Sequence, residues 1–110
     1  MASFPYLMMM LTLFVGTRQE GAKEKVFTMV REQFESYTII EGQGYYQGRG
    51  EPVWEVKIAT ADPIAVLNLA GRIREELHQE SVGIEHAGHY HRLTCDHPAD
   101  ELRQLIQAAC

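Results

Sequence analysis

The stretch YTIIEGQGYYQGRGEPVWEVKIAT, residues Tyr37–Thr60, decides the fold. Its two flanks, Tyr37–Tyr46 and Val53–Thr60, are rich in Val, Ile, Thr, Tyr and Trp, which suit a pleated, half-buried surface. The segment between them, Gln47–Pro52, contains Gly and Pro, the residues that punctuate turns. This pattern predicts an antiparallel hairpin with a glycine-rich tip.

The second flank alternates as a strand with one buried face does. One side carries the apolar residues Trp54, Val56 and Ile58. The other side carries Val53, Glu55 and Lys57. We therefore expect one face of the hairpin to pack on a core and the other to be wet or to lie at an interface.

Two segments show the spacing of amphipathic helices, with apolar residues at three- and four-residue steps. The first is Ala22–Ser36. The second opens at Asp62-Pro63, a good capping residue followed by proline at the first helical position. A third, short helix is expected to begin at Asp96-His97-Pro98.

Two further segments are predicted to be strands. Tyr6–Val15 is an almost unbroken apolar run, which is typical of a buried central strand. It is too short to span a bilayer, and no basic residue precedes it as in a signal peptide. Ser81–Leu93 alternates well at first and is expected to form a fourth strand, bent near Gly88.

The resulting order, β-α-β-β-α-β followed by a helix, is the ferredoxin-like split βαβ arrangement of the α+β class. We expect a single domain over residues 1–110, with both long helices on one face of an antiparallel sheet. The other face stays open, and Trp54, Tyr90 and either Tyr45 or Tyr46 are expected to line part of it. An open apolar sheet face normally finds a partner, so a homodimer or higher homo-oligomer is expected.

Composition excludes several classes of protein. Hydrophobic residues at 45% and charged residues at 23% are ordinary globular values. A net charge of -5 argues against broad nucleic-acid binding but leaves room for a local anion site. The two cysteines, Cys95 and Cys110, are interpreted as free thiols in a reducing cytoplasm, and no membrane association is expected.

Features of the hairpin point to a small, anionic ligand. Glycine inside a strand, as at Gly42 and Gly44, weakens it unless a bulge or a close approach is needed. The adjacent tyrosines could offer a flat ligand an aromatic surface, and Arg49 could bind an anion. There are alternatives to ligand binding. The same strand residues could pack across a dimer interface, and the glycines at the tip could be those that a tight turn needs. The candidate ligand-binding residues are Gly42, Gly44, Tyr45, Tyr46, Arg49, Trp54 and Lys57.

The same two strands also offer a polar cluster. Glu41, Gln43 and Tyr45 share one face of the second strand, and Glu55 and Lys57 share one face of the third. If these faces coincide, a pair of carboxylates could serve as acid and base. Ordinary cross-strand charge pairing accounts for the same residues.

A run of histidines is the candidate metal site. His89 and His91 point to one face of a strand, with Glu85 further along that side. Such a pair can hold zinc or another first-row metal with a third ligand such as Cys95 or His97. Solvated or hydrogen-bonded histidines at a polar strand end are the alternative. His86, in line with Val82 and Ile84, is expected to be a partly buried structural histidine.

The hairpin, followed after a helix by HQESV at His78–Val82, resembles an uncharacterised bacterial family described as a domain of unknown function. The matching positions are Val15-Gly16, Phe34, Gly44-Tyr45-Tyr46, Glu51 and Gln79-Glu80-Ser81-Val82. The resemblance covers roughly residues 12–86, and this chain has Tyr46 where that family tends to have Trp. It implies no activity. Short proteins of this kind also resemble products of bacterial viruses, which implies a host-directed accessory role.

No Walker loop, nucleophile elbow, dinucleotide fingerprint or Cys-His protease pattern is present, which argues against an enzyme. Our first hypothesis is a non-enzymatic homo-oligomer that binds an anionic, nucleotide-like molecule. If the chain is a viral accessory protein, it would sequester or sense a host signal molecule in this way. The second is a small metal- or histidine-dependent enzyme that uses His89 and His91. The third is a protein-interaction or inhibitor module.

Overall fold

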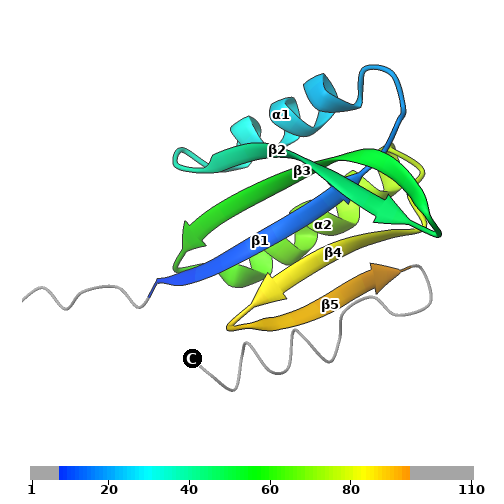
Figure 1. The fold of residues 1–110 in the computed structure, drawn as a ribbon. Coiled ribbons are helices and arrows are strands. Elements are labelled where there is room, and N and C mark those ends of the chain that lie inside the picture. Colours follow the sequence, from blue (N-terminus) through cyan, green and yellow to red (C-terminus); the bar gives the residue numbers. More distant parts are fainter. Residues whose placement is uncertain (1–7, 95–110) are drawn as a thin grey trace, which may run out of the picture.

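The computed structural model describes residues 8–94 of the chain. They form a five-stranded antiparallel sheet and two helices, and α2 lies behind the sheet in the view of Figure 1. The elements are β1 (Met9–Gly16), α1 (Ala22–Gln33), β2 (Thr38–Tyr46), β3 (Arg49–Thr60), α2 (Pro63–Glu76), β4 (Ser81–His86) and β5 (His89–Thr94). Neither helix is long and apolar enough to cross a membrane, as far as the described residues show.

The strands lie in the order β2-β3-β1-β4-β5, and each neighbouring pair is antiparallel. The order of the first four is that of the ferredoxin-like split βαβ arrangement. The fifth strand pairs outside β4, so the complete sheet departs from a strict ferredoxin-like fold. The predicted α+β class and the antiparallel sheet are confirmed.

The core lies between the sheet and the two helices. Alternate residues of β1 and β3 enter it and are almost completely buried: Leu11, Leu13, Val15, Trp54, Val56 and Ile58. From α1, Phe27 meets the Trp54 ring edge-on at a centroid distance of 6.0 Å. The ammonium group of Lys23 lies 5.6 Å from the centroid of each ring, where a cation is attracted to aromatic faces.

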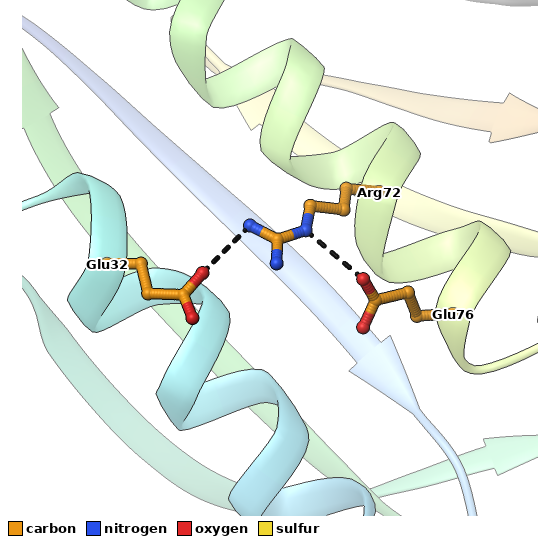
Figure 2. A network of polar contacts seen from close by, with 3 residues as sticks. All are labelled: Glu32, Arg72 and Glu76. Carbon is orange, nitrogen blue, oxygen red and sulfur yellow. Dashed lines mark hydrogen bonds and ion pairs between the residues drawn. The ribbon is translucent and has the colours of Figure 1, made fainter.

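A capping residue sets the start of α2, and ion pairs join α2 to α1. The Asp62 carboxylate accepts a hydrogen bond from the Ala65 amide at 3.3 Å, which caps the helix as predicted. Arg72 lies between the helices, as Figure 2 shows, 3.0 Å from a Glu32 carboxylate oxygen and 3.2 Å from one of Glu76. Hydrogen bonds to Glu32 and then to Glu76 raise the pKa of Arg72 above its ordinary value.

Two predictions about turns were wrong. Ser81–Leu93 is not one bent strand but two strands, joined by Ala87 and Gly88 with φ angles of 52° and 80°. Positive φ at both central residues is the geometry of a tight type I′ hairpin turn. The tip of the long hairpin is likewise only Gln47-Gly48, with φ angles of 52° and 78°, so Arg49–Pro52 belongs to β3.

Element bounds differ less. The first strand begins at Met9 among the described residues, and α1 ends at Gln33 instead of Ser36. The helix predicted to begin at Asp96 lies outside the described residues.

Candidate functional site

The face of the sheet opposite the helices carries four glycines and a hollow of about 400 Å³. The register places Gly16 beside Val53, Val53 beside Gly42, and Gly83 beside Phe14. Residues paired in this way point to the same side of a sheet. Three of the glycines, Gly16, Gly44 and Gly83, line the hollow, together with aromatic residues that include Phe14, Tyr46 and Tyr90.

Each of these three glycines is covered by a side chain from a neighbouring strand. A Cβ atom added to Gly16 would clash with the Glu51 carboxylate, and one added to Gly44 would clash with Val53. At Gly83 it would clash with the ring and hydroxyl of Tyr90. Because three Cβ atoms are missing, these three side chains can lie close to the backbone of the sheet and form a low floor to the hollow.

The hollow is also polar. Glu51, Glu80 and Arg92 line it. The Arg92 guanidinium donates to the Ser81 hydroxyl, with nitrogen–oxygen distances of 2.8 and 3.3 Å. These bonds fix the guanidinium at the β4–β5 side of the hollow. Among the described residues, Glu51 and Glu80 have no ion-pair partner.

A second hollow, of about 600 Å³, adjoins the first and shares Gly16, Tyr46, Glu51 and Gln79 with it. Arg18 and Arg49 also line it. The Arg18 guanidinium donates to the Gly50 carbonyl oxygen. The two hollows together thus contain three arginines and two glutamates, a local positive excess in an acidic chain.

The structure separates the predicted ligand-binding residues onto two faces. Gly42, Gly44, Tyr46, Arg49 and Lys57 hold register positions on the open face. Of these, Gly44, Tyr46 and Arg49 meet at the hollows, whereas Gly42 and Lys57 are not among the lining residues.

Tyr45 and Trp54 belong to the helix-covered side. Trp54 is only 8% exposed, so the expectation that it lines the open face was wrong. Successive residues of a strand point to opposite faces, and the core takes the even-numbered residues of this part of β3. Tyr45 pairs with Gly50, and its ring lies against that glycine, although the residue also borders the first hollow.

The predicted polar cluster does not form. Glu41 pairs with Trp54 and Gln43 with Pro52, which places both on the helix-covered side. Glu55 and Lys57 point to the open face. The two sets of residues lie on opposite sides of the sheet.

The histidines are arranged differently from the prediction. His89 and His91 share a face, with ring centroids 6.5 Å apart, but Glu85 pairs with Tyr90 and lies on the other face. His86, and not Glu85, shares the face of these two histidines, because it pairs directly with His89. Within residues 8–94, no group of three or more potential metal ligands converges on one point. Cys95 and His97 lie outside the described residues.

Sequence reasoning missed several residues of the hollow. Gly83 was passed over, although it is a glycine inside a strand and carries the same signal as Gly42 and Gly44. Arg92 and Arg18 carry no local signal, because only the register brings them to the hollows. Glu80 and Ser81 belong to the family resemblance, and Ser81 also begins a predicted strand, but neither was a candidate site residue.

The comparisons with known proteins bear on the fold alone. No family model matches the chain, and no curated protein matches it. A solved structure described as "phage SAM lyase in apo state" has a TM-score of 0.55 and 20% identity, over 80% of this chain and 90% of that one. The de novo designed protein Foldit4 has a TM-score of 0.51 and 15% identity, over 73% of this chain and 96% of that one. The fold therefore occurs in a phage protein and in a designed one.

Proposed function

We propose that this chain binds a small, nucleotide-like molecule on the open face of its sheet and does so as a homo-oligomer. The observation that carries the proposal is the glycine-floored hollow of about 400 Å³, with Tyr46 and Tyr90 among its lining residues. This volume lies within the range of small-molecule sites, roughly 300–1,000 Å³.

The charges support an anionic group at one end of the ligand. Arg18 and Arg49 line the second hollow, which adjoins the first and shares Tyr46 and Glu51 with it. Guanidinium groups bind carboxylate and phosphate oxygens in a bidentate manner. A flat ring in the first hollow and an anion in the second would use both.

Exposed apolar side chains support a contact between subunits. Met10 is 56% exposed and Ile40 42% exposed, and both hold register positions on the open face. Tyr46 and Tyr90 add exposed aromatic surface on the same side. A second subunit against this face would cover these groups and close the hollows from above.

A second candidate function is a lyase reaction on SAM, the activity named for the phage structure with the same fold. The observation that favours it is the pair of carboxylates, Glu51 and Glu80, in one hollow. Two carboxylates beside a bound molecule could hold its positive charge or move a proton. Since one fold hosts many functions, this candidate rests on the hollow as well as on the likeness.

Titration of the ¹⁵N-labelled protein with AMP and, separately, with SAM tests both candidates. Binding at the site should shift the amide signals of Gly16, Gly44 and Gly83, and the control signal of Gly71 in α2 should stay in place. Shifts with AMP support the first candidate. Conversion of SAM, followed by chromatography of the products and lost in Glu51→Gln, supports the second. If neither molecule shifts the three glycine signals, the proposed site is wrong.

The two adjacent tyrosines of β2 provide a matched pair of variants. Tyr46→Ala should weaken binding, because Tyr46 lines both hollows. Tyr45→Ala should weaken binding less, because Tyr45 borders only the first hollow and its ring lies against Gly50. Equal losses in the two variants would contradict the assignment of the open face. Arg49→Ala should weaken binding of AMP more than binding of adenosine.

A further inference from the structure

Gly83 occupies a position in which the backbone does not require glycine. It lies inside β4, between Phe14 of β1 and Arg92 of β5, and it is buried. Its φ is outside the left-handed region, unlike that of Gly88 in the turn. Glycine in the middle of a strand is destabilising relative to alanine, so a neighbouring group must need the space that a Cβ would fill.

That group is Tyr90. Its ring and hydroxyl lie over Gly83, although its direct partner in the register is Glu85, so the side chain extends diagonally along the sheet. The ring also contacts Phe14, at a centroid distance of 5.9 Å and an interplanar angle of 58°. An aromatic ring laid over a glycine of the next strand is a known stabilising arrangement in sheets.

The Tyr90 ring is partly exposed and available for contact with a ligand. Tyr90 is 60% exposed even though it contacts both Gly83 and Phe14. Among the described residues, its hydroxyl has no hydrogen-bond partner. The first hollow is thus bordered by a flat, supported aromatic surface with one polar group beside the floor.

We infer that Tyr90, held in place over Gly83, is the stacking surface for a heteroaromatic ring of the ligand and that its hydroxyl forms a hydrogen bond with a polar substituent attached to that ring. This inference rests on the proposed function and specifies which part of the ligand the β4–β5 side receives. Stacking suits any heteroaromatic ring, because every such ring has a π-face. Selectivity among ligands then comes from the hydroxyl, which favours rings that carry a polar substituent within its reach.

The test compares three variants at the pair with one control, using AMP as the probe in calorimetric titrations of the full chain. Tyr90→Ala removes the surface and should raise the Kd about tenfold or more, in keeping with the effect of removing an aromatic ring that stacks on a base. Tyr90→Phe keeps the surface and should raise the Kd only by about threefold, the loss of one hydrogen bond. Gly83→Ala leaves Tyr90 in the sequence but forces its ring away from the floor, so it should resemble Tyr90→Ala.

Gly42→Ala is the matched control. Gly42 lies on the same face, but an added Cβ would meet only ordinary contacts, the nearest being a Glu55 oxygen at 3.7 Å. Its binding of AMP should equal that of the parental chain. Far-ultraviolet circular dichroism of each variant establishes that it is folded, and Tyr90→Ala decides the matter if Gly83→Ala does not fold.

The outcomes separate this inference from the proposed function. If Tyr90→Ala and folded Gly83→Ala bind AMP within about twofold of the parental chain, and the Gly16 and Gly44 signals still shift, the role of Tyr90 is refuted while the site stands. If the parental chain shows no shift with AMP or SAM, both are refuted. A large loss in Gly42→Ala equal to that in Gly83→Ala would also overturn the inference, because the effect would then not depend on the ring.

Discussion

Replacing Leu13 by alanine should cost about 3–4 kcal/mol of unfolding free energy, one of the largest losses available in this chain. Leu13 lies in the central strand β1 and is completely buried. Its register partners are Val56 on one side and Ile84 on the other, both also completely buried. Removing three carbon atoms loses about 2.5 kcal/mol of transfer free energy. The paired strands prevent the gap from collapsing, so a cavity term adds to that loss.

Urea unfolding followed by the fluorescence of Trp54, the single tryptophan, measures this loss. Met10→Ala is the matched control, because Met10 is in the same strand but points to the open face and is 56% exposed. It should change stability by no more than about 0.5 kcal/mol when measured at a protein concentration low enough for subunits to separate. A loss below about 1.5 kcal/mol in Leu13→Ala, or an equal loss in both variants, would refute the assignment of the buried face.

Two further predictions concern the helices. Gly71→Ala should stabilise the chain by about 0.5–1 kcal/mol, since glycine is unfavourable inside a helix. The added Cβ would meet Leu93 at an ordinary contact distance of 3.9 Å. If thermal unfolding showed that the variant is less stable than the parental chain, α2 would have to pack differently. Arg72 joins Glu32 of α1 to Glu76 of α2, and added salt should weaken these ion pairs and lower the melting temperature of the parental chain. Arg72→Ala lacks the ion pairs, so most of this fall in melting temperature should be absent in the variant. Because the pKa of Arg72 is raised, its contribution is lost on the alkaline side only as the pH rises through the folded-state pKa of this side chain. Neutral and mildly alkaline pH should therefore give the same result. Arg31→Ala, in the last turn of α1, is the control, and equal salt dependence in all three proteins would contradict the prediction.

The sequence was sufficient for the order of the first four strands and both helices, because each element has its own signal. The signal is an unbroken apolar run in β1, β-prone residues or alternation in β2, β3 and β4, and three- and four-residue steps in the helices. It failed at the β4–β5 turn for a specific reason. A two-residue turn places His86 opposite His89, so the alternation shifts from even-numbered residues in β4 to odd-numbered residues in β5 on the same face. The hydrophobic pattern does not reveal this shift, because His89, His91 and Arg92 are polar. The turn residues are Ala87 and Gly88, and alanine at φ 52° is not the asparagine or aspartate that usually marks such a turn.

The faces of the long hairpin could have been predicted more fully than they were. With a turn of any even length, Tyr46 pairs with an odd-numbered residue of β3 and so points away from Trp54. The observed two-residue turn pairs it with Arg49, which points to the open face. Tyr45 and Trp54 therefore belong together on the other side, and a ligand set that includes both tyrosines conflicts with the period of the strand. What needed the structure was the register, which decides that Glu51 lies beside Gly44 and Val53 beside Gly16.

The hollow itself could not be predicted from local sequence, because its three glycines come from three strands, β1, β2 and β4, and are far apart in the sequence. The signal at each position is nonetheless physical: a glycine inside a strand loses stability, and that loss has to serve something. Here each missing Cβ makes room for one neighbouring side chain, Glu51, Val53 or Tyr90, to lie flat on the sheet. Crowding alone could have been relieved in another way. Smaller side chains at positions 51, 53 and 90 would have left room for alanine in place of the three glycines, and the strands would have been more stable. A carboxylate and a tyrosine hydroxyl held low in the same hollow are a more specific result than relief of crowding requires. The proposed binding surface would account for this cost in stability, because proteins commonly give up stability for function.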